Sequence, residues 1–114
     1  MSIQILEKPM TLTQVREIAK EWYGIMIKGT VDVERNKVAI GGDYHMESAE
    51  LLVKDGSNHN NVWGFNIWFE GDRVLEFDSL VNIKPALGSR NRALEDKNII
   101  RTATEIINSW IKFK

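Results

Sequence analysis

Apolar residues recur at helical spacing in three parts of the chain. The first part covers 15–22, and the glycine that follows predicts a helix ending near Tyr23. The second, 46–53, predicts a short helix closed by a glycine at position 56. The third, 99–111, has a broad apolar face, and Asp96 stands where a helix N-cap is expected. The pattern therefore predicts three amphipathic helices.

Between these helices the hydrophobic period changes to two, which is typical of strands. The stretch 26–34 alternates apolar and polar residues, so it predicts a strand with one solvent-facing side, followed by a return strand at 38–40. A short apolar stretch, 3–6, predicts an edge strand. The strongest pair, 62–69 and 73–83, predicts a long hairpin.

Loop length decides which side chains of this hairpin share a face. A two-residue loop would place the carboxylates of Glu76 and Asp78 among aromatic side chains, which is energetically costly. We therefore predict a three-residue loop, 70–72, that pairs Phe69 with Arg73. The side chains then expected in the core are Trp63, Phe65, Leu75 and Phe77. Those expected on the opposite face are Asn66, Glu76 and Asp78.

The predicted element order is β-α-β-β-α-β-β-α. Because hairpins dominate, we expect an α+β fold: a two-layer sandwich with a mainly antiparallel sheet and helices on one face. A chain of 114 residues fits one domain, 1–114. The chain has no cysteine and no apolar stretch near the roughly 20 residues of a membrane span. With no secretory signal visible, we expect a soluble, cytoplasmic protein.

Several motifs together resemble a known family. They are Gly41–His45, Asp55–Ser57, Trp63–Asn66, Glu76–Pro85, and the residues Gly88, Arg90, Arg92, Glu95 and Asp96. The sequence resembles the domain of unknown function 5674 family, an uncharacterised family of short prokaryotic proteins. The resemblance covers nearly the whole chain and implies the fold boundaries, and it implies no reaction.

Charge is unevenly distributed although the chain as a whole carries only -1. Basic residues are concentrated in the last third of the chain, and an irregular loop, 84–92, leads into the last predicted helix. The candidate ligand-binding residues here are Asn82, Lys84, Gly88, Arg90 and Arg92. The two arginines can hold a phosphate or carboxylate, or they can pair with nearby acids and pin the loop. A net charge near zero argues against tight nonspecific binding of nucleic acid.

The polar face of the hairpin and the segment before the second predicted helix provide further candidates. Glu76, His45 and Asp43 are the candidate catalytic residues, since carboxylates and imidazoles act as general acids and bases. Oxygen ligands on the polar face could hold a divalent cation, but a solvated sheet surface has the same composition, and we assign no metal or cofactor. Trp68, a large aromatic on a polar face, is the candidate interface residue of a homodimer.

Two functions remain open. The first is a small binding or interaction module with an anion-binding basic loop, whose ligand contains phosphate. The alternative is a small hydrolytic or ribonuclease-like enzyme that uses Glu76 and His45 together with Arg90 and Arg92. The usual motifs of serine nucleophiles and phosphate-binding glycine loops are missing from the sequence.

Overall fold

A five-stranded sheet organises the chain, and the computed structural model describes residues 3–71 and 74–113. The strands in spatial order are β1 (Gln4–Ile5), β4 (Lys37–Ile40), β3 (Met26–Asp32), β5 (Val62–Trp68) and β6 (Leu75–Glu76). All neighbouring pairs in this sheet are antiparallel. A separate parallel pair joins β2 (Met10–Thr11) to β7 (Ile111–Lys112). The α+β class and the mainly antiparallel sheet are confirmed, and β1 is an edge strand as predicted.

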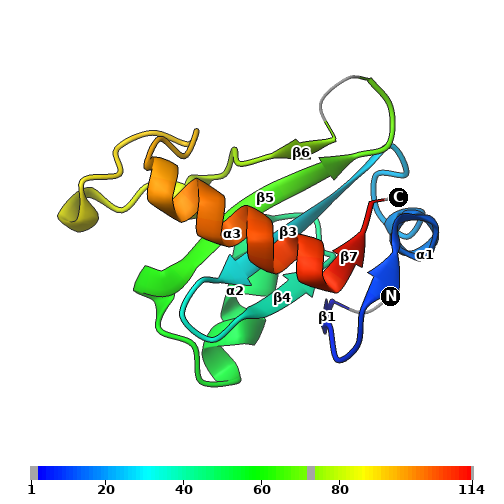
Figure 1. Cartoon of the computed structure of the whole chain (residues 1–114), viewed down its shortest axis with the longest axis horizontal. Coiled ribbons are helices and arrows are strands. Elements are labelled where there is room, and N and C mark those ends of the chain that lie inside the picture. The colour runs from blue at the N-terminus through cyan, green and yellow to red at the C-terminus, as the bar shows by residue number, and fades with distance from the viewer. Residues whose placement is uncertain (1–2, 72–73, 114) are drawn as a thin grey trace.

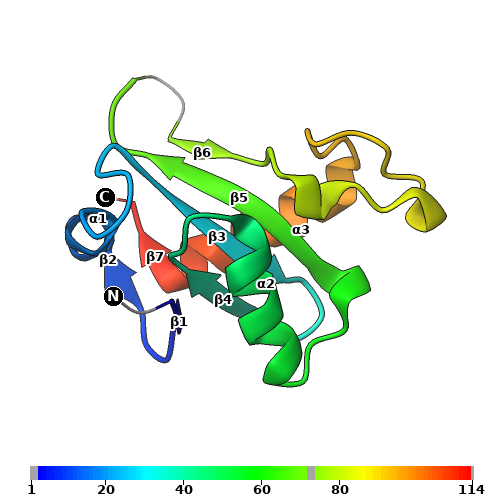
Figure 2. The same ribbon diagram turned by 180° about the vertical axis from the view of Figure 1, so that it is seen from behind.

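Helices cover both faces of the sheet. They are α1 (Leu12–Ala19), α2 (His45–Lys54) and α3 (Lys97–Trp110). Figure 1 shows α3 lying across the front of the sheet, and Figure 2 shows α2 on the opposite side. The expectation that all helices share one face is therefore wrong for α2. The contact between α2 and the sheet is partly polar, because the Thr30 hydroxyl of β3 donates a hydrogen bond to Ser48 Oγ of α2 at 3.0 Å.

The two sides of the sheet have separate cores. The larger core lies against α1 and α3 and includes Val15, Ile27, Val31, Trp63, Phe65 and Ile107. The smaller core lies under α2 and consists of Ala39, Ala49, Leu52, Val62 and Val81. Polar residues that the alternating pattern placed on a solvent-facing side of the sheet are buried by α2 and the loops beside it. They include Thr30, Asp32 and Asn66.

Asp96 caps α3 as predicted. Its Oδ1 accepts hydrogen bonds from the backbone N–H groups of Asn98 at 2.9 Å and Ile99 at 3.2 Å, two of the groups that a helix start leaves unpaired. One side of α3 contributes Ala103, Ile106 and Ile107 to the larger core. Within the part of the chain that the structure describes, no helix is long and apolar enough to cross a membrane.

The predicted register of the long hairpin is confirmed. Asn66 pairs with Glu76 and Ile67 with Leu75, which is the alignment that follows from a three-residue loop. Trp63 and Phe65 are buried, while Leu75 and Phe77 are half-buried against the larger core. The loop residue Asp72 and its neighbour Arg73 lie outside the described residues.

The second strand of the hairpin is much shorter than the predicted 73–83. After β6 the chain turns into a short 3-10 helix at Leu80–Asn82, and Val81 enters the smaller core instead of the larger one. The amide of Asn82 replaces the missing strand pairing. Its Oδ1 accepts from the Gly64 N–H at 2.7 Å, and its Nδ2 donates to the Gly64 carbonyl at 3.1 Å.

The first helix ends at Ala19, four residues before the predicted end. The Gly24 N–H still donates to the Ala19 carbonyl at 3.0 Å, and Gly24 has a φ of 77°, so the glycine does terminate this segment. Beyond the helix, Trp22 packs against Gly41, where a Cβ would lie 2.7 Å from its ring. This turn places Tyr23 beside the start of α2.

Candidate functional site

A cleft lies on the α2 side of the sheet and has two lobes. The helix lobe, of about 480 Å3, lies next to the start of α2 and is lined by Tyr23, Lys28, Asp43, Tyr44, His45, Met46, Ser79, Leu80, Val81 and Arg92. The hairpin lobe, of about 500 Å3, lies next to β6 and is lined by Tyr23, Ile25, Met26, Lys28, Asn66, Trp68, Glu76, Asp78 and Arg92. Three residues, Tyr23, Lys28 and Arg92, line both lobes, so the two lobes are adjacent.

Two cations stand where the lobes meet. Lys28 projects from the middle of β3, and its ammonium lies 5.5 Å from the centre of the Tyr23 ring. Burial lowers the pKa of Lys28, and the nearby positive charge of Arg92 lowers it further. Arg92 Nε lies 3.0 Å from Asp78 Oδ1, and both side chains are largely exposed. The N–H is not aligned for a hydrogen bond, so this contact is an ion pair only, and Asp78 Oδ1 has no hydrogen-bond partner.

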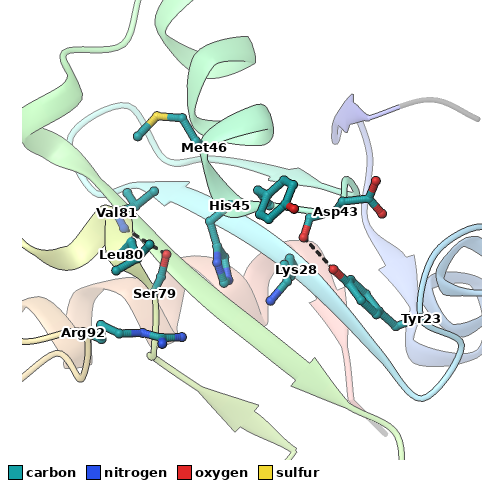
Figure 3. Close-up of a pocket in the computed structure, with 10 residues that line it drawn as sticks. Tyr23, Lys28, Asp43, His45, Met46, Ser79, Leu80, Val81 and Arg92 are labelled. Carbon is teal, nitrogen blue, oxygen red and sulfur yellow. Dashed lines mark hydrogen bonds between the residues drawn. The ribbon is translucent and has the colours of Figure 1, made fainter.

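His45, the first residue of α2, is buried in the wall of the helix lobe. Its Nε2 lies 2.8 Å from Asn66 Oδ1 and 3.0 Å from the Phe65 carbonyl oxygen. Burial lowers the pKa of His45 to about 4, and the positive charges of Lys28 and Arg92 act in the same direction. The imidazole is therefore neutral at pH 7. Figure 3 shows it hanging from the start of α2 between Lys28 and Ser79.

Asn66 connects His45 to the acidic side of the hairpin lobe. Its Nδ2 donates to Glu76 Oε1 at 3.1 Å and to the Asp78 carbonyl at 3.2 Å. The Trp68 indole N–H donates to the same Glu76 oxygen at 3.0 Å. Two N–H donors from β5 therefore hold this carboxylate oxygen in place. Glu76 is thus positioned by β5 on the face opposite Phe65, as the register predicted.

Asp43 takes part in the site mainly through its backbone. Its carbonyl accepts a hydrogen bond from the Tyr23 hydroxyl at 2.7 Å, which ties the turn after α1 to the turn before α2. The side chain of Glu47 accepts from the backbone N–H groups of Asp43 and Tyr44 at 2.8 and 2.9 Å. Glu47 therefore closes the N-terminus of α2 and does not face the cleft as a free acid.

A comparison with protein-family models gives one match, described as "Protein of unknown function (DUF5674)", over residues 4–110. The match covers almost the whole chain. The chain belongs to the DUF5674 family. No curated protein and no solved structure gives a significant match to it.

Two of the segments that carry the DUF5674 resemblance supply walls of the cleft. The segment 41–45 contributes Asp43, Tyr44 and His45, and the segment 76–85 contributes Glu76, Asp78 and the short 3-10 helix. The cleft is therefore lined by candidate residues from three separate parts of the sequence: Asp43 and His45, Glu76, and Arg92. Trp68 lines its hairpin lobe.

The other candidate ligand-binding residues of this DUF5674 chain lie outside the cleft lining. The amide of Asn82 is fully engaged with backbone groups of Gly64 and Arg92. Lys84 is buried; its ammonium donates to the His59 carbonyl at 2.9 Å and lies 5.1 Å from the centre of the Trp63 ring. This burial lowers the pKa of Lys84 to about 8. Gly88 lies in an exposed turn with a φ of 83°.

Arg90 is exposed, and among the described residues its side chain has no ion pair or hydrogen bond. Of the acids that might have pinned the loop, Asp78 pairs with Arg92. Glu95 accepts a hydrogen bond from the Asn91 amide at 2.8 Å. The basic loop therefore contributes one arginine to the cleft, Arg92.

Sequence reasoning missed Lys28, Tyr23, Tyr44 and Leu80 as members of the site. Lys28 looked like an ordinary residue on the polar side of a strand, and only the position of α2 turns that side into a cavity wall. Tyr44 and Leu80 are recognisable from the structure, because they are large side chains with 71% and 70% of their surface exposed. Within residues 3–71 and 74–113, the structure has no group of three or more His, Asp or Glu side chains that could hold a metal ion.

Proposed function

We propose that this protein is a small ligand-binding module whose cleft holds an anionic group, a phosphate or a carboxylate, between Lys28 and Arg92. The observation that carries the proposal is the placement of two cations on the same partly buried cleft. Burial lowers the pKa of Lys28, and the positive charge of Arg92 lowers it further. An anion bound between them relieves this repulsion and gains charge-assisted hydrogen bonds from both.

The rest of the helix lobe suits the apolar part of such a ligand. Tyr44, Leu80 and Met46 are exposed at its mouth, with 71%, 70% and 43% of their surface accessible. Small-molecule sites are concave and mostly apolar, with a few polar groups that fix the orientation of the ligand. Arg92 comes from the basic loop, so the anion site uses one end of the loop that the sequence singled out. We assign this activity to the cytoplasm of a prokaryotic cell, in line with a chain that has no cysteine.

The test is a titration of the protein with inorganic phosphate, followed through backbone amide NMR shifts. Lys28→Met should weaken binding by roughly tenfold or more, because it removes a charged partner of the anion. The matched control is Lys20→Met, since Lys20 is exposed, pairs with Glu17 at 2.7 Å and does not line the cleft. Phosphate-dependent shifts outside the cleft, or an unchanged affinity in Lys28→Met, would reject the anion site.

A homodimer is a second proposal, supported by apolar side chains at the hairpin end of the sheet. Ile25 and Val74 are 52% and 36% exposed, and Trp68 is half-buried. Val74 is next to Trp68, whose N–H donates to the Val74 carbonyl at 2.7 Å, and Ile25 lines the hairpin lobe together with Trp68. We call this group the hairpin patch and propose it as the contact between two copies.

A further inference from the structure

His45 directs one of its ring nitrogens into the protein. Both neighbours of Nε2, the Asn66 side-chain oxygen and the Phe65 carbonyl, are acceptors, at 2.8 and 3.0 Å. The orientation of the Asn66 amide is itself fixed, because its Nδ2 faces two other acceptors on Glu76 and Asp78. Nε2 therefore has to carry the proton of the neutral ring.

The other ring nitrogen, Nδ1, is then an unprotonated acceptor, and it faces the cleft. Among the described residues Nδ1 has no hydrogen-bond partner. The buried side-chain atoms without a partner in this part of the chain are Asp32 Oδ2 and Asp78 Oδ1, and Nδ1 does not belong to them, so it is accessible from outside the protein. The Cδ2 edge of the ring points toward Gly64, where a Cβ would lie 3.2 Å away. Nδ1 lies on the opposite edge of the ring, and His45 lines the helix lobe.

An acceptor next to two cations selects for a particular kind of ligand group. The lone pair of Nδ1 repels the anion itself, so it needs a donor from another part of the ligand. An ammonium donor would be repelled by Lys28 and Arg92, which line the same lobe. A hydroxyl group is a neutral donor and meets neither objection.

Resting on the proposed anion site, we propose that His45 Nδ1 accepts a hydrogen bond from a hydroxyl group of a phosphate ester held by Lys28 and Arg92. The ligand class is then a hydroxylated phosphate monoester. His45 acts as a specificity-determining residue, and Asn66 with Glu76 positions its ring. The low pKa of His45 supports this role, since the ring stays an acceptor over the whole neutral range.

The test compares glycerol 3-phosphate with propyl phosphate, which has the same carbon chain and no hydroxyl. At pH 8 both phosphates are dianions without a P–OH donor, since their second pKa is near 6. The parent protein should bind glycerol 3-phosphate roughly three- to tenfold more tightly, the range of one net hydrogen bond. Nitrogen-15 NMR of the free protein should show the Nε2–H tautomer of His45.

Two variants separate the two ring nitrogens. His45→Gln keeps an inward N–H donor near the position of Nε2 and loses the outward acceptor, so the preference for glycerol 3-phosphate should disappear. His45→Asn keeps an oxygen acceptor near the position of Nδ1, so the preference should persist although the inward hydrogen bonds are lost. Thermal melts check that each variant is folded.

The possible outcomes are distinct. If the parent binds both esters equally, or if Nδ1 carries the proton, the role of His45 is refuted while the anion site stands. A preference that survives in His45→Gln would equally refute it. If the parent binds neither ester nor inorganic phosphate, both the anion site and the hydroxyl contact are wrong.

Discussion

Arg90 and Arg92 are separated by a single residue, yet their surroundings differ. Arg92 lines both lobes of the cleft and forms an ion pair with Asp78, whereas Arg90 is exposed and has no partner among the described residues. The two readings of the loop, pinning and anion binding, therefore both concern Arg92. The Arg92–Asp78 pair is largely exposed, and such pairs contribute little to stability.

We predict that Arg92→Ala changes the free energy of unfolding by less than about 1 kcal/mol. Phosphate should raise the melting temperature of the parent protein, because a ligand that binds only the folded state stabilises it. This rise should be lost in Arg92→Ala and retained in Arg90→Ala. Thermal melts of the three proteins with and without phosphate measure both effects. Strong destabilisation by Arg92→Ala, with no phosphate response in the parent, would show that Arg92 serves as a pin only.

At the same scale, the sequence identifies part of the site and misses the rest for a physical reason. His45, Glu76 and Arg92 belong to residue types that perform binding chemistry, so composition and spacing single them out. Lys28 belongs to the same class but stands in an ordinary alternating strand. Its partial burial depends on α2 and on residues 79–81, which come from distant parts of the chain. Such tertiary placement leaves no local pattern.

At the scale of elements, the segment after β6 shows where periodicity misleads. Residues 73–83 alternate well enough to predict a long strand, but pairing with β5 stops at Glu76. From there the Ser79 side chain occupies the space beside Gly64, whose missing Cβ makes this close approach possible. The amide of Asn82 then pairs with the Gly64 backbone in place of a strand. A side chain has replaced backbone pairing, and no alternation pattern encodes that substitution.

Asn82→Ala should therefore lower the free energy of unfolding by about 2–4 kcal/mol, because it leaves the buried backbone N–H and carbonyl of Gly64 without the Asn82 amide as their partner. The matched control is Asn91→Ala, since Asn91 is exposed and its amide donates to the nearby Glu95; its effect should stay within about 0.5 kcal/mol. Urea unfolding measures both. Equal stabilities for the two variants would mean that the Asn82 amide does not hold this segment.

At the scale of the whole molecule, the α+β class, the antiparallel sheet and the hairpin register follow from hydrophobic period and from the cost of burying carboxylates. The same two arguments do not predict that α2 covers the other face of the sheet. Its apolar residues are few, and the sheet side beneath it carries Thr30, Asp32 and Asn66, so the pattern indicates a solvent-facing surface. Polar contacts such as the Thr30–Ser48 hydrogen bond satisfy these groups in the interior. The cleft exists because this polar face is only partly covered.

The open end of the same face bears on association. The hairpin patch of Ile25, Trp68 and Val74 lies at the far end of β5, and two of its residues, Ile25 and Trp68, line the hairpin lobe, while the helix lobe lies next to α2. A contact between two copies at the patch would therefore involve residues of the hairpin lobe and none of those that line the helix lobe. Trp68 is the largest side chain of the patch, and its indole N–H is already satisfied by Glu76.

We predict an apparent mass above the 13.1 kDa of one chain in equilibrium sedimentation, and a lower apparent mass for Trp68→Ser. Burial of a tryptophan ring in a contact between copies favours association, and serine removes that area. Since Trp68→Ser also removes the indole donor to Glu76, Val74→Ser serves as a second variant that leaves this hydrogen bond intact and should lower the mass in the same direction. A mass of 13.1 kDa for the parent protein and both variants would exclude the homodimer and leave Trp68 as a wall of the ligand cleft.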